Sequence, residues 1–311
     1  MGTYIEAAAT AHHRGHLRHR GALHLSDTAA TRCLARAHHR PDDLDLLINT
    51  GLYKDYNTAE PALAAIIQDD IAANRGSPPR LGHHGTFSFD LLNGGCGVVS
   101  AAQLLDGFIC QGTARYGLIV AADVDPSPRT SRGFPFPPAG GAMLIAHTDD
   151  ATGFQRFALR TFPEHAALFE AHVRWDPRAG VLHRGRNVLE VHQATEFAER
   201  CVAQSCEVTR EFLADAGLTA TDIDLVIASQ YPRCFADQVA GRLGIPQNRL
   251  PDIAPDLAGI HTAGPIAALE AAIAAGQLAR ARHVLFVTVG AGLTVGVALY
   301  TTGHTPACRT T

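Results

Sequence analysis

The feature that most constrains the fold of this chain is an internal repeat. Residues 43–48 read DLDLLI and residues 222–227 read DIDLVI, and each copy follows a segment with the spacing of an amphipathic helix. Farther along, residues 101–122 resemble residues 266–289, since both read as a helix, a glycine turn and a buried strand. Repeats this far apart are typical of two similar half-domains rather than of a solenoid of short units.

Helical patterns alternate with buried apolar strands along the whole chain, which predicts an α/β layered fold. The 311 residues suffice for a large core, and a composition of 46% hydrophobic and 18% charged residues is that of a globular protein. We expect an N-terminal half at 1–150 and a C-terminal half at 151–311. Within them, EPALAAIIQDDIAAN predicts a helix with Pro61 near its start, and the proline-rich segment 125–141 predicts a loop.

Cys96 lies in the most distinctive local motif. An apolar, strand-like segment at 86–92 runs into the glycine-rich corner NGGCG, and a helix with apolar residues through Val98 to Phe108 follows. A cysteine at a helix start lies near the positive end of the helix dipole, which favours the thiolate, and the glycines leave room for a substrate. The corner therefore suits a thiol that accepts an acyl group from a thioester. The alternative is a buried cysteine packed where small residues alone fit.

The repeat and the corner together resemble the thiolase superfamily, and most closely the ketosynthase III (β-ketoacyl-acyl-carrier-protein synthase III) group. NGGCG is similar to its nucleophile corner, and GIHTAGPIAALEAAIAAGQL to its glycine-asparagine-threonine segment and the helix after it. VTVGAGLTVGVALY (287–300) is similar to its C-terminal glycine loop and last strand, and PPAGGAMLIAH (137–147) to the strand closing the first half. The resemblance implies a thiolase-like five-layer αβαβα fold made of two duplicated halves, with the site between them.

The resemblance also implies a catalytic set, from which this sequence departs. Cys96 corresponds to the nucleophile, Ser229 stands where the group has a histidine, and His261 stands where it has an asparagine. The backbone N–H groups of Cys96 and Ala291 correspond to the oxyanion hole. Arg132 resembles an arginine that contacts the coenzyme A nucleotide, although a solvated arginine is an equally ordinary interpretation.

These departures bear on the reaction. Cysteine with one histidine suffices for acyl transfer, whereas a decarboxylative condensation needs two donors for the enolate oxygen. We therefore expect a ketosynthase III-like acyltransferase of specialised metabolism, moving an acyl group from a CoA or carrier-protein thioester through Cys96 to an acceptor, with Ser229 and His261 in the site. The alternatives are a decarboxylative β-ketoacyl synthase that uses malonyl carrier protein, and a non-catalytic ketosynthase-like partner subunit. The resemblance implies a homodimer and no bound cofactor.

Composition argues against several other classes. A net charge of −4 does not favour nucleic-acid binding, and no apolar stretch reaches the roughly 18–20 residues that cross a bilayer. The N-terminus lacks a signal-peptide pattern, so we expect a cytoplasmic protein with its seven cysteines as free thiols. Histidines cluster at 12, 13, 16 and 19, but arginines interrupt them and no carboxylate or cysteine accompanies them. We expect no metal site there; a metal-binding module is the remaining alternative.

Overall fold

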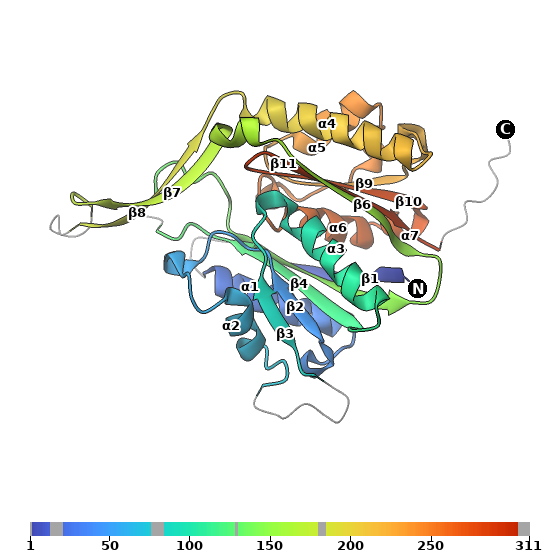
Figure 1. Cartoon of the computed structure of the whole chain (residues 1–311), viewed down its shortest axis with the longest axis horizontal. Coiled ribbons are helices and arrows are strands. Elements are labelled where there is room, and N and C mark those ends of the chain that lie inside the picture. Colours follow the sequence, from blue (N-terminus) through green and yellow to red (C-terminus); the bar gives the residue numbers. More distant parts are fainter. Residues whose placement is uncertain (1, 13–20, 76–83, 128–129, 180–184, 304–311) are drawn as a thin grey trace.

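The computed structural model describes residues 2–12, 21–75, 84–127, 130–179 and 185–303. Two β-sheets are stacked with helices between them and on both outer faces (Figure 1). The first sheet has the order β1–β5–β4–β2–β3, with β1 (Gly2–His12), β2 (Leu46–Asn49), β3 (Phe87–Asp90), β4 (Tyr116–Asp123) and β5 (Ala139–Thr148). The second has the order β6–β11–β10–β9, with β6 (Gly153–Thr161), β9 (Leu225–Ala228), β10 (His283–Gly290) and β11 (Thr294–Thr301).

The helices complete five layers. They are α1 (Ala22–Arg36), α2 (Leu63–Asp70), α3 (Gly97–Cys110), α4 (Phe197–Asp215), α5 (Phe235–Leu243), α6 (Gly264–Ala274) and the short α7 (Gln277–Arg280). Helix α1 packs on the first sheet and α4 on the second, while α3 and α6 contact strands of both sheets. The αβαβα order predicted from the sequence is therefore present. No helix in the described ranges is both long and apolar enough to cross a membrane.

The two sheets repeat one pattern of strand pairing. In the first, β2 is parallel to β4, β4 is antiparallel to β5, and β5 is antiparallel to β1. In the second, β9 is parallel to β10, β10 is antiparallel to β11, and β11 is antiparallel to β6. The sequence repeat thus corresponds to a structural one, and residue 150 falls in the connection between β5 and β6. Strand β3 is the additional strand of the first sheet.

The central helices are apolar on most of their surface because each lies between two sheets. In α3 the side chains of Val98, Val99, Leu105 and Ile109 are buried. The apolar spacing predicted Phe108 on this face, but Phe108 is 37% exposed and Ile109 is buried instead. Helix α2 begins at Leu63, shortly after Pro61, as the sequence indicated.

A β-hairpin projects from the body of the molecule at the left of Figure 1. It consists of β7 (Phe169–Asp176) and β8 (Arg186–Gln193), which pair antiparallel. The hairpin carries the only tryptophan, Trp175, whose side chain is 63% exposed. It lies in the C-terminal half, in the stretch that connects β6 to α4.

Strand β3 forms one edge of the first sheet, and its described residues pair on one side, with β2. Four large apolar side chains of the segment from β3 through α3 are exposed: Phe87, Leu92, Leu104 and Phe108. An unpaired edge with exposed aromatic residues is a template for pairing with a second chain. A homodimer through β3 therefore remains our prediction.

We expect light scattering to give about twice the 33.0 kDa chain mass at micromolar concentration. The double substitution Phe87→Glu/Phe108→Glu should produce monomers, because charges at an apolar interface lose hydration without gaining a partner. Trp175→Glu, on the projecting hairpin, is the matched control and should stay dimeric. A wild-type protein of 33.0 kDa would contradict the prediction.

Candidate active site

The glycine corner joins β3 to α3 by a single turn of 3₁₀-helix at Gly94–Cys96. The Cys96 N–H donates to the Asn93 carbonyl over 3.0 Å, which closes this turn. Gly94 has φ +49°, a left-handed conformation that glycine adopts without strain. The corner packs against the β10–β11 turn, where Gly290 and Ala291 lie. Two glycine-rich segments far apart in sequence thus meet between the halves.

Cys96 is fully buried, and its sulfur is directed at the second sheet. The Sγ atom donates to the Thr294 carbonyl over 3.2 Å. Burial raises the pKa of this thiol to about 12, although hydrogen bonds from Thr288 and from the backbone of Gly296 and Gly290 offset part of the effect. Desolvation therefore exceeds the effect of the helix dipole, which favours the thiolate. The residue has the geometry of a packed, protonated cysteine.

This placement predicts a difference in reactivity among the cysteines. At a pH of about 8, iodoacetamide should alkylate the exposed Cys234 in the native protein and leave Cys96 unmodified, because the thiolate is the reacting species. Peptide mapping after alkylation measures both residues in one sample. In urea both should react, which serves as the control. Rapid native alkylation of Cys96 would refute this assignment.

His261 lies just before α6 and is held by a carboxylate from the other half of the chain. Its Nδ1 atom is 3.0 Å from Oδ2 of Asp123, at the end of β4. The same Oδ2 accepts hydrogen bonds from the backbone N–H and the hydroxyl of Thr262, at 3.0 and 2.6 Å. Because the Asp123 carboxylate accepts this hydrogen bond, Nδ1 carries the proton. In the neutral imidazole Nε2 is then the nitrogen without a proton. The Nε2 atom faces the glycine corner, 4.0 Å from the place where a Cβ of Gly94 would stand.

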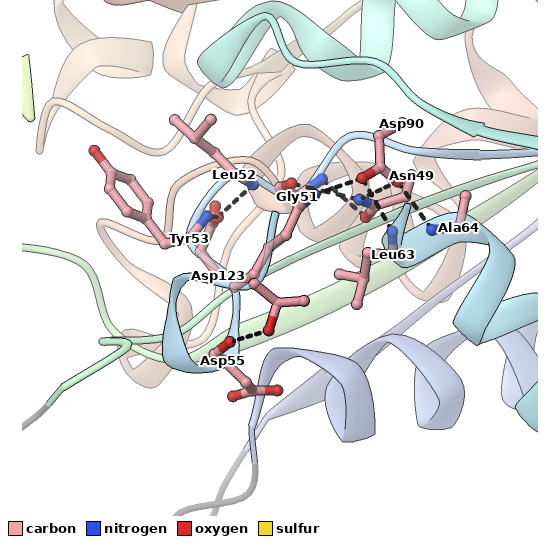
Figure 2. Close-up of polar contacts among 11 residues, drawn as sticks. Asn49, Gly51, Leu52, Tyr53, Asp55, Leu63, Ala64, Asp90 and Asp123 are labelled. Atoms are coloured by element: carbon pink, nitrogen blue, oxygen red, sulfur yellow. Dashed lines mark hydrogen bonds and ion pairs between the residues drawn. The ribbon is translucent and has the colours of Figure 1, made fainter. Parts of the chain in front are cut away.

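Asp123 was not identified from the sequence, although it is the central acceptor of the site. Its Oδ1 atom accepts hydrogen bonds from the backbone N–H groups of Leu52 and Tyr53, at 2.8 and 2.7 Å (Figure 2). Burial opposes ionisation of Asp123, but the charge of His261 and these hydrogen bonds hold its pKa below the usual value. The available signal was an acidic residue at the end of the buried strand YGLIVAAD.

A second carboxylate holds the other end of the segment that carries Tyr53. Asp90 accepts hydrogen bonds from the N–H groups of Leu63 and Ala64, at 3.0 and 2.9 Å, and thereby caps α2 (Figure 2). It also accepts from Lys54 Nζ at 2.5 Å. The Lys54–Asp90 pair is almost fully buried. The segment between β2 and α2 is thus held at both ends.

Aromatic rings cover one side of His261. Phe136 stacks on the imidazole with ring centroids 4.2 Å apart and planes 20° apart, and the Tyr53 ring lies 5.6 Å away. Phe136 also contacts the Tyr231 ring. The imidazole side chain is 10% exposed, so these rings shield it from bulk water while Nε2 stays directed at the corner.

Ser229 and Ala291 are both at the corner but differ in availability. Ser229 Oγ is buried and accepts a hydrogen bond from the Val289 N–H over 3.1 Å. It lies 3.5 Å from the Cβ place of Gly95. The Ala291 nitrogen is 3.6 Å from the Cβ place of Gly94, on an exposed turn. Of the two predicted oxyanion donors, the Cys96 N–H donates within its own turn, to Asn93, whereas the Ala291 nitrogen lies beside Gly94.

Arg132 is paired within the protein. Its guanidinium binds Asp176 on β7 at 2.5 Å and Glu190 on β8 at 2.6 Å. Both contacts join Arg132 to the projecting hairpin. The segment 125–141, predicted as a loop, includes the first residues of β5, which begins at Ala139. A coenzyme A phosphate would have to replace these carboxylates, so the predicted nucleotide contact stays a prediction.

The histidine cluster at the N-terminus falls mostly outside the described residues. His12, at the end of β1, is 3.0 Å from Asp256. Among the residues that the structure describes, no group of three or more histidine, cysteine, aspartate or glutamate side chains has the arrangement of a metal site.

The comparisons with known proteins agree with this architecture. Residues 213–302 match the C-terminal domain of 3-oxoacyl-[acyl-carrier-protein (ACP)] synthase III. Beta-ketoacyl-[acyl-carrier-protein] synthase III of Aquifex aeolicus is 25% identical over 281 residues, covering 89% of this chain and 82% of the relative. The same enzyme of Coxiella burnetii is 27% identical over 278 residues, covering 87% and 81%.

Solved structures show the same fold. The Aquifex aeolicus synthase III superposes with a TM-score of 0.77 at 20% identity, covering 97% of this chain and all of the other. Xanthomonas campestris OleA, solved with lauric acid and lauroyl-CoA, has a TM-score of 0.77 at 15% identity, with coverages of 97% and 99%. A priming β-ketosynthase of the R1128 polyketide pathway has 0.76 at 19%, with coverages of 98% and 97%.

The chain has the thiolase-like fold, with its two paired halves. Residues 213–302 match the synthase III C-terminal domain, and most of the chain is similar to ketosynthase III enzymes.

The role of Asp123 can be measured through stability. Asp123→Asn removes the negative charge to which His261, Thr262 and two backbone N–H groups donate hydrogen bonds. We expect the free energy of unfolding to fall by about 3–5 kcal/mol. Because the folded pKa is depressed, the stabilisation is complete above the unfolded value of 3.8 and disappears as the pH falls below it. Urea unfolding at neutral and acidic pH tests both statements, with a smaller wild-type advantage in acid.

Asp125→Asn is the matched control. Asp125 follows Asp123 by two residues, and its Oδ1 accepts a hydrogen bond from Ser127 N–H at 2.9 Å on a partly exposed loop. We expect a loss of about 1 kcal/mol or less. Equal losses in the two variants would remove the special role of Asp123.

Proposed function

We propose that this chain is a ketosynthase III-like acyltransferase of specialised biosynthesis, acting on an acyl thioester of CoA or of an acyl carrier protein. The observation that carries the proposal is the His261–Asp123 pair, which aims one imidazole nitrogen at a glycine corner beside the Ala291 N–H. A base and an amide donor beside one glycine corner are elements of acyl transfer. The names of the relatives support a thioester as the substrate class.

In this proposal His261 is the acid–base residue. Its Nε2 takes the proton of the acceptor and later gives it to the departing thiolate, while Asp123 stabilises the imidazolium that forms between these steps. Ser229 has a different role, because its hydroxyl is buried and already bonded to Val289. The single imidazole offers one side-chain donor to an enolate oxygen, which favours acyl transfer over decarboxylative condensation.

The covalent route through Cys96 makes additional demands. Its sulfur must turn away from the Thr294 carbonyl and lose a proton despite a pKa raised to about 12. Acyl transfer through Cys96 therefore requires a movement of the sulfur away from Thr294 as well as a base that removes its proton.

The non-catalytic partner subunit predicted as an alternative has one distinguishing consequence. Such a protein would bind a carrier protein or a second ketosynthase and release no thiol from any acyl-CoA. A panel from acetyl-CoA to lauroyl-CoA, with hydroxylamine as a surrogate acceptor and thiol release as the signal, separates the two. Malonyl-CoA in the same assay, read by CO₂ release, tests the decarboxylative alternative.

Two alanine variants test the assignment of the base. His261→Ala should lower the rate of thiol release by about 10²–10⁴, the usual contribution of a positioned acid–base group. Ser229→Ala should cost much less, because its hydroxyl binds the backbone of β10. Circular dichroism verifies that both variants fold. Losses of the same size would mean that Ser229 shares the chemistry and that the single-base mechanism is wrong.

A further inference from the structure

Strand β9 is the edge of the second sheet and lacks a neighbour that its counterpart in the first sheet has. In the first half, the carbonyls of Asp45 and Asn49 accept hydrogen bonds from the N–H groups of Phe87 and Leu91, both at 2.8 Å, so that β3 extends the sheet beyond β2. Strand β9 occupies the place of β2, but no strand in the described ranges pairs with its outer edge. The duplicated fold thus has a strand position that this chain does not use in its second half.

Residues 250–259 pass this edge without pairing with it. They follow α5 as β3 follows α2, but they form no strand, and Pro251 and Pro255 lack the N–H groups that a strand needs. In the part of the chain that the structure describes, no backbone hydrogen bond joins this segment to β9. A cavity of about 320 Å³ is lined by the segment, by the start of α5, and by Val226 and Ala228 of β9.

The backbone of β9 offers hydrogen bonds on this side. The Ser229 N–H donates to the Val287 carbonyl of β10 over 3.1 Å. Because alternate residues of a parallel strand bond to the same neighbour, Val226 and Ala228 turn their N–H and C=O groups to the outer edge. The Ala228 carbonyl accepts from the Gln230 side chain at 2.9 Å, and a carbonyl oxygen has a lone pair for a second donor. An added strand would find here the partners that β2 gives to β3.

The charged groups around β3 indicate what such a strand would carry. Asp90, the last residue of β3, places its carboxylate on the N–H groups of Leu63 and Ala64 at the start of α2 and on the ammonium group of Lys54 (Figure 2). In the second half, Arg233 follows the repeat DIDLVI by the same number of residues as Lys54 follows DLDLLI, and α5 begins shortly after it. The cation and the helix start are repeated, whereas the carboxylate is not.

Arg233 is available for a carboxylate from outside the chain. Its side chain lines the cavity and is exposed, and its guanidinium has no ion pair or hydrogen bond with any residue that the structure describes. Helix α5 has no side-chain hydrogen bond at its N-cap, Cys234. Asp237 and Asp252 also line the cavity and are exposed, so a second acidic residue in the partner would be repelled. The cavity therefore suits a strand with a single carboxylate.

We propose that the outer edge of β9 binds an extended segment of a partner protein, which adds to the second sheet as a strand parallel to β9 and places one aspartate side chain on Arg233 at the start of α5. The backbone pairing provides affinity without a sequence requirement, and the single carboxylate sets the register, because Arg233 lies beyond the end of β9. The inference goes beyond the proposed function, since neither β9 nor Arg233 has a step in acyl transfer.

A synthetic peptide tests the carboxylate. The probe is fluorescein-labelled Thr-Val-Ser-Val-Asp-Leu with blocked ends, which copies the polar and apolar order of residues 86–91. We expect saturable binding to the full chain by fluorescence anisotropy. Asparagine in place of the peptide aspartate should weaken binding about tenfold or more, because a charge-assisted hydrogen bond is lost, and Arg233→Gln should weaken it by the same factor. The two changes together should cost no more than either one. Arg174→Gln, at an exposed position of the hairpin, is the control and should bind as wild type does.

A second measurement tests the strand pairing. On addition of the peptide, hydrogen exchange followed by NMR should slow at the N–H groups of Val226 and Ala228, and N-methylation of the two valines and the leucine of the peptide should abolish binding. Absence of saturable binding, equal affinity of wild type and Arg233→Gln, or equal affinity of the N-methylated peptide would overturn the proposal. Self-association of wild type beyond a dimer that Arg233→Gln prevents would also overturn it, because a second copy of the chain would then occupy the edge.

Discussion

The hydrogen bonds of Asp123 are the interaction on which the site depends. Asp123 is buried at the end of β4 in the first sheet. Its two oxygens accept hydrogen bonds from the segment before α2 and from the turn before α6. A buried carboxylate needs several hydrogen-bond donors. Loss of any one of these donors would destabilise the folded protein, so the segments that supply them are held in one arrangement. The direction of His261 follows from the same bonds, so the stability of the interface and the chemistry of the site have a common origin.

The glycine corner shows how packing decides whether a side chain is buried or faces the site. Cys96 stands at the start of α3, where a dipole argument alone favours a reactive thiolate. The second sheet packs directly on this point and removes the sulfur from water, and desolvation exceeds the dipole contribution. His261 approaches from the other side of the turn, at Gly94.

The sequence predicted the larger elements well, because their signals are local. The repeat of DLDLLI and DIDLVI indicated two halves, and the paired strands β2 and β9 occupy equivalent places in the two sheets. Helix α2 and the strand-to-helix corner were also predicted. The prediction from apolar spacing was wrong at Phe108, which is exposed. A helix between two sheets has no single apolar stripe, and the packing of neighbouring elements decides which residues near its end are exposed.

What the sequence by itself determined is the duplicated α/β fold, which follows from its periodicity and its internal repeat. The expectation that Cys96, Ser229, His261 and the glycine loop gather between the halves came from the resemblance to the ketosynthase III group. Only the tertiary structure decided which of these groups face one another, since this depends on side-chain direction across a turn of a few residues. It brought Asp123 to His261 across 138 positions of sequence, turned Cys96 into the second sheet, and engaged Arg132 with two carboxylates. Contacts between distant segments carry no local pattern, and for that reason they were not visible in the sequence.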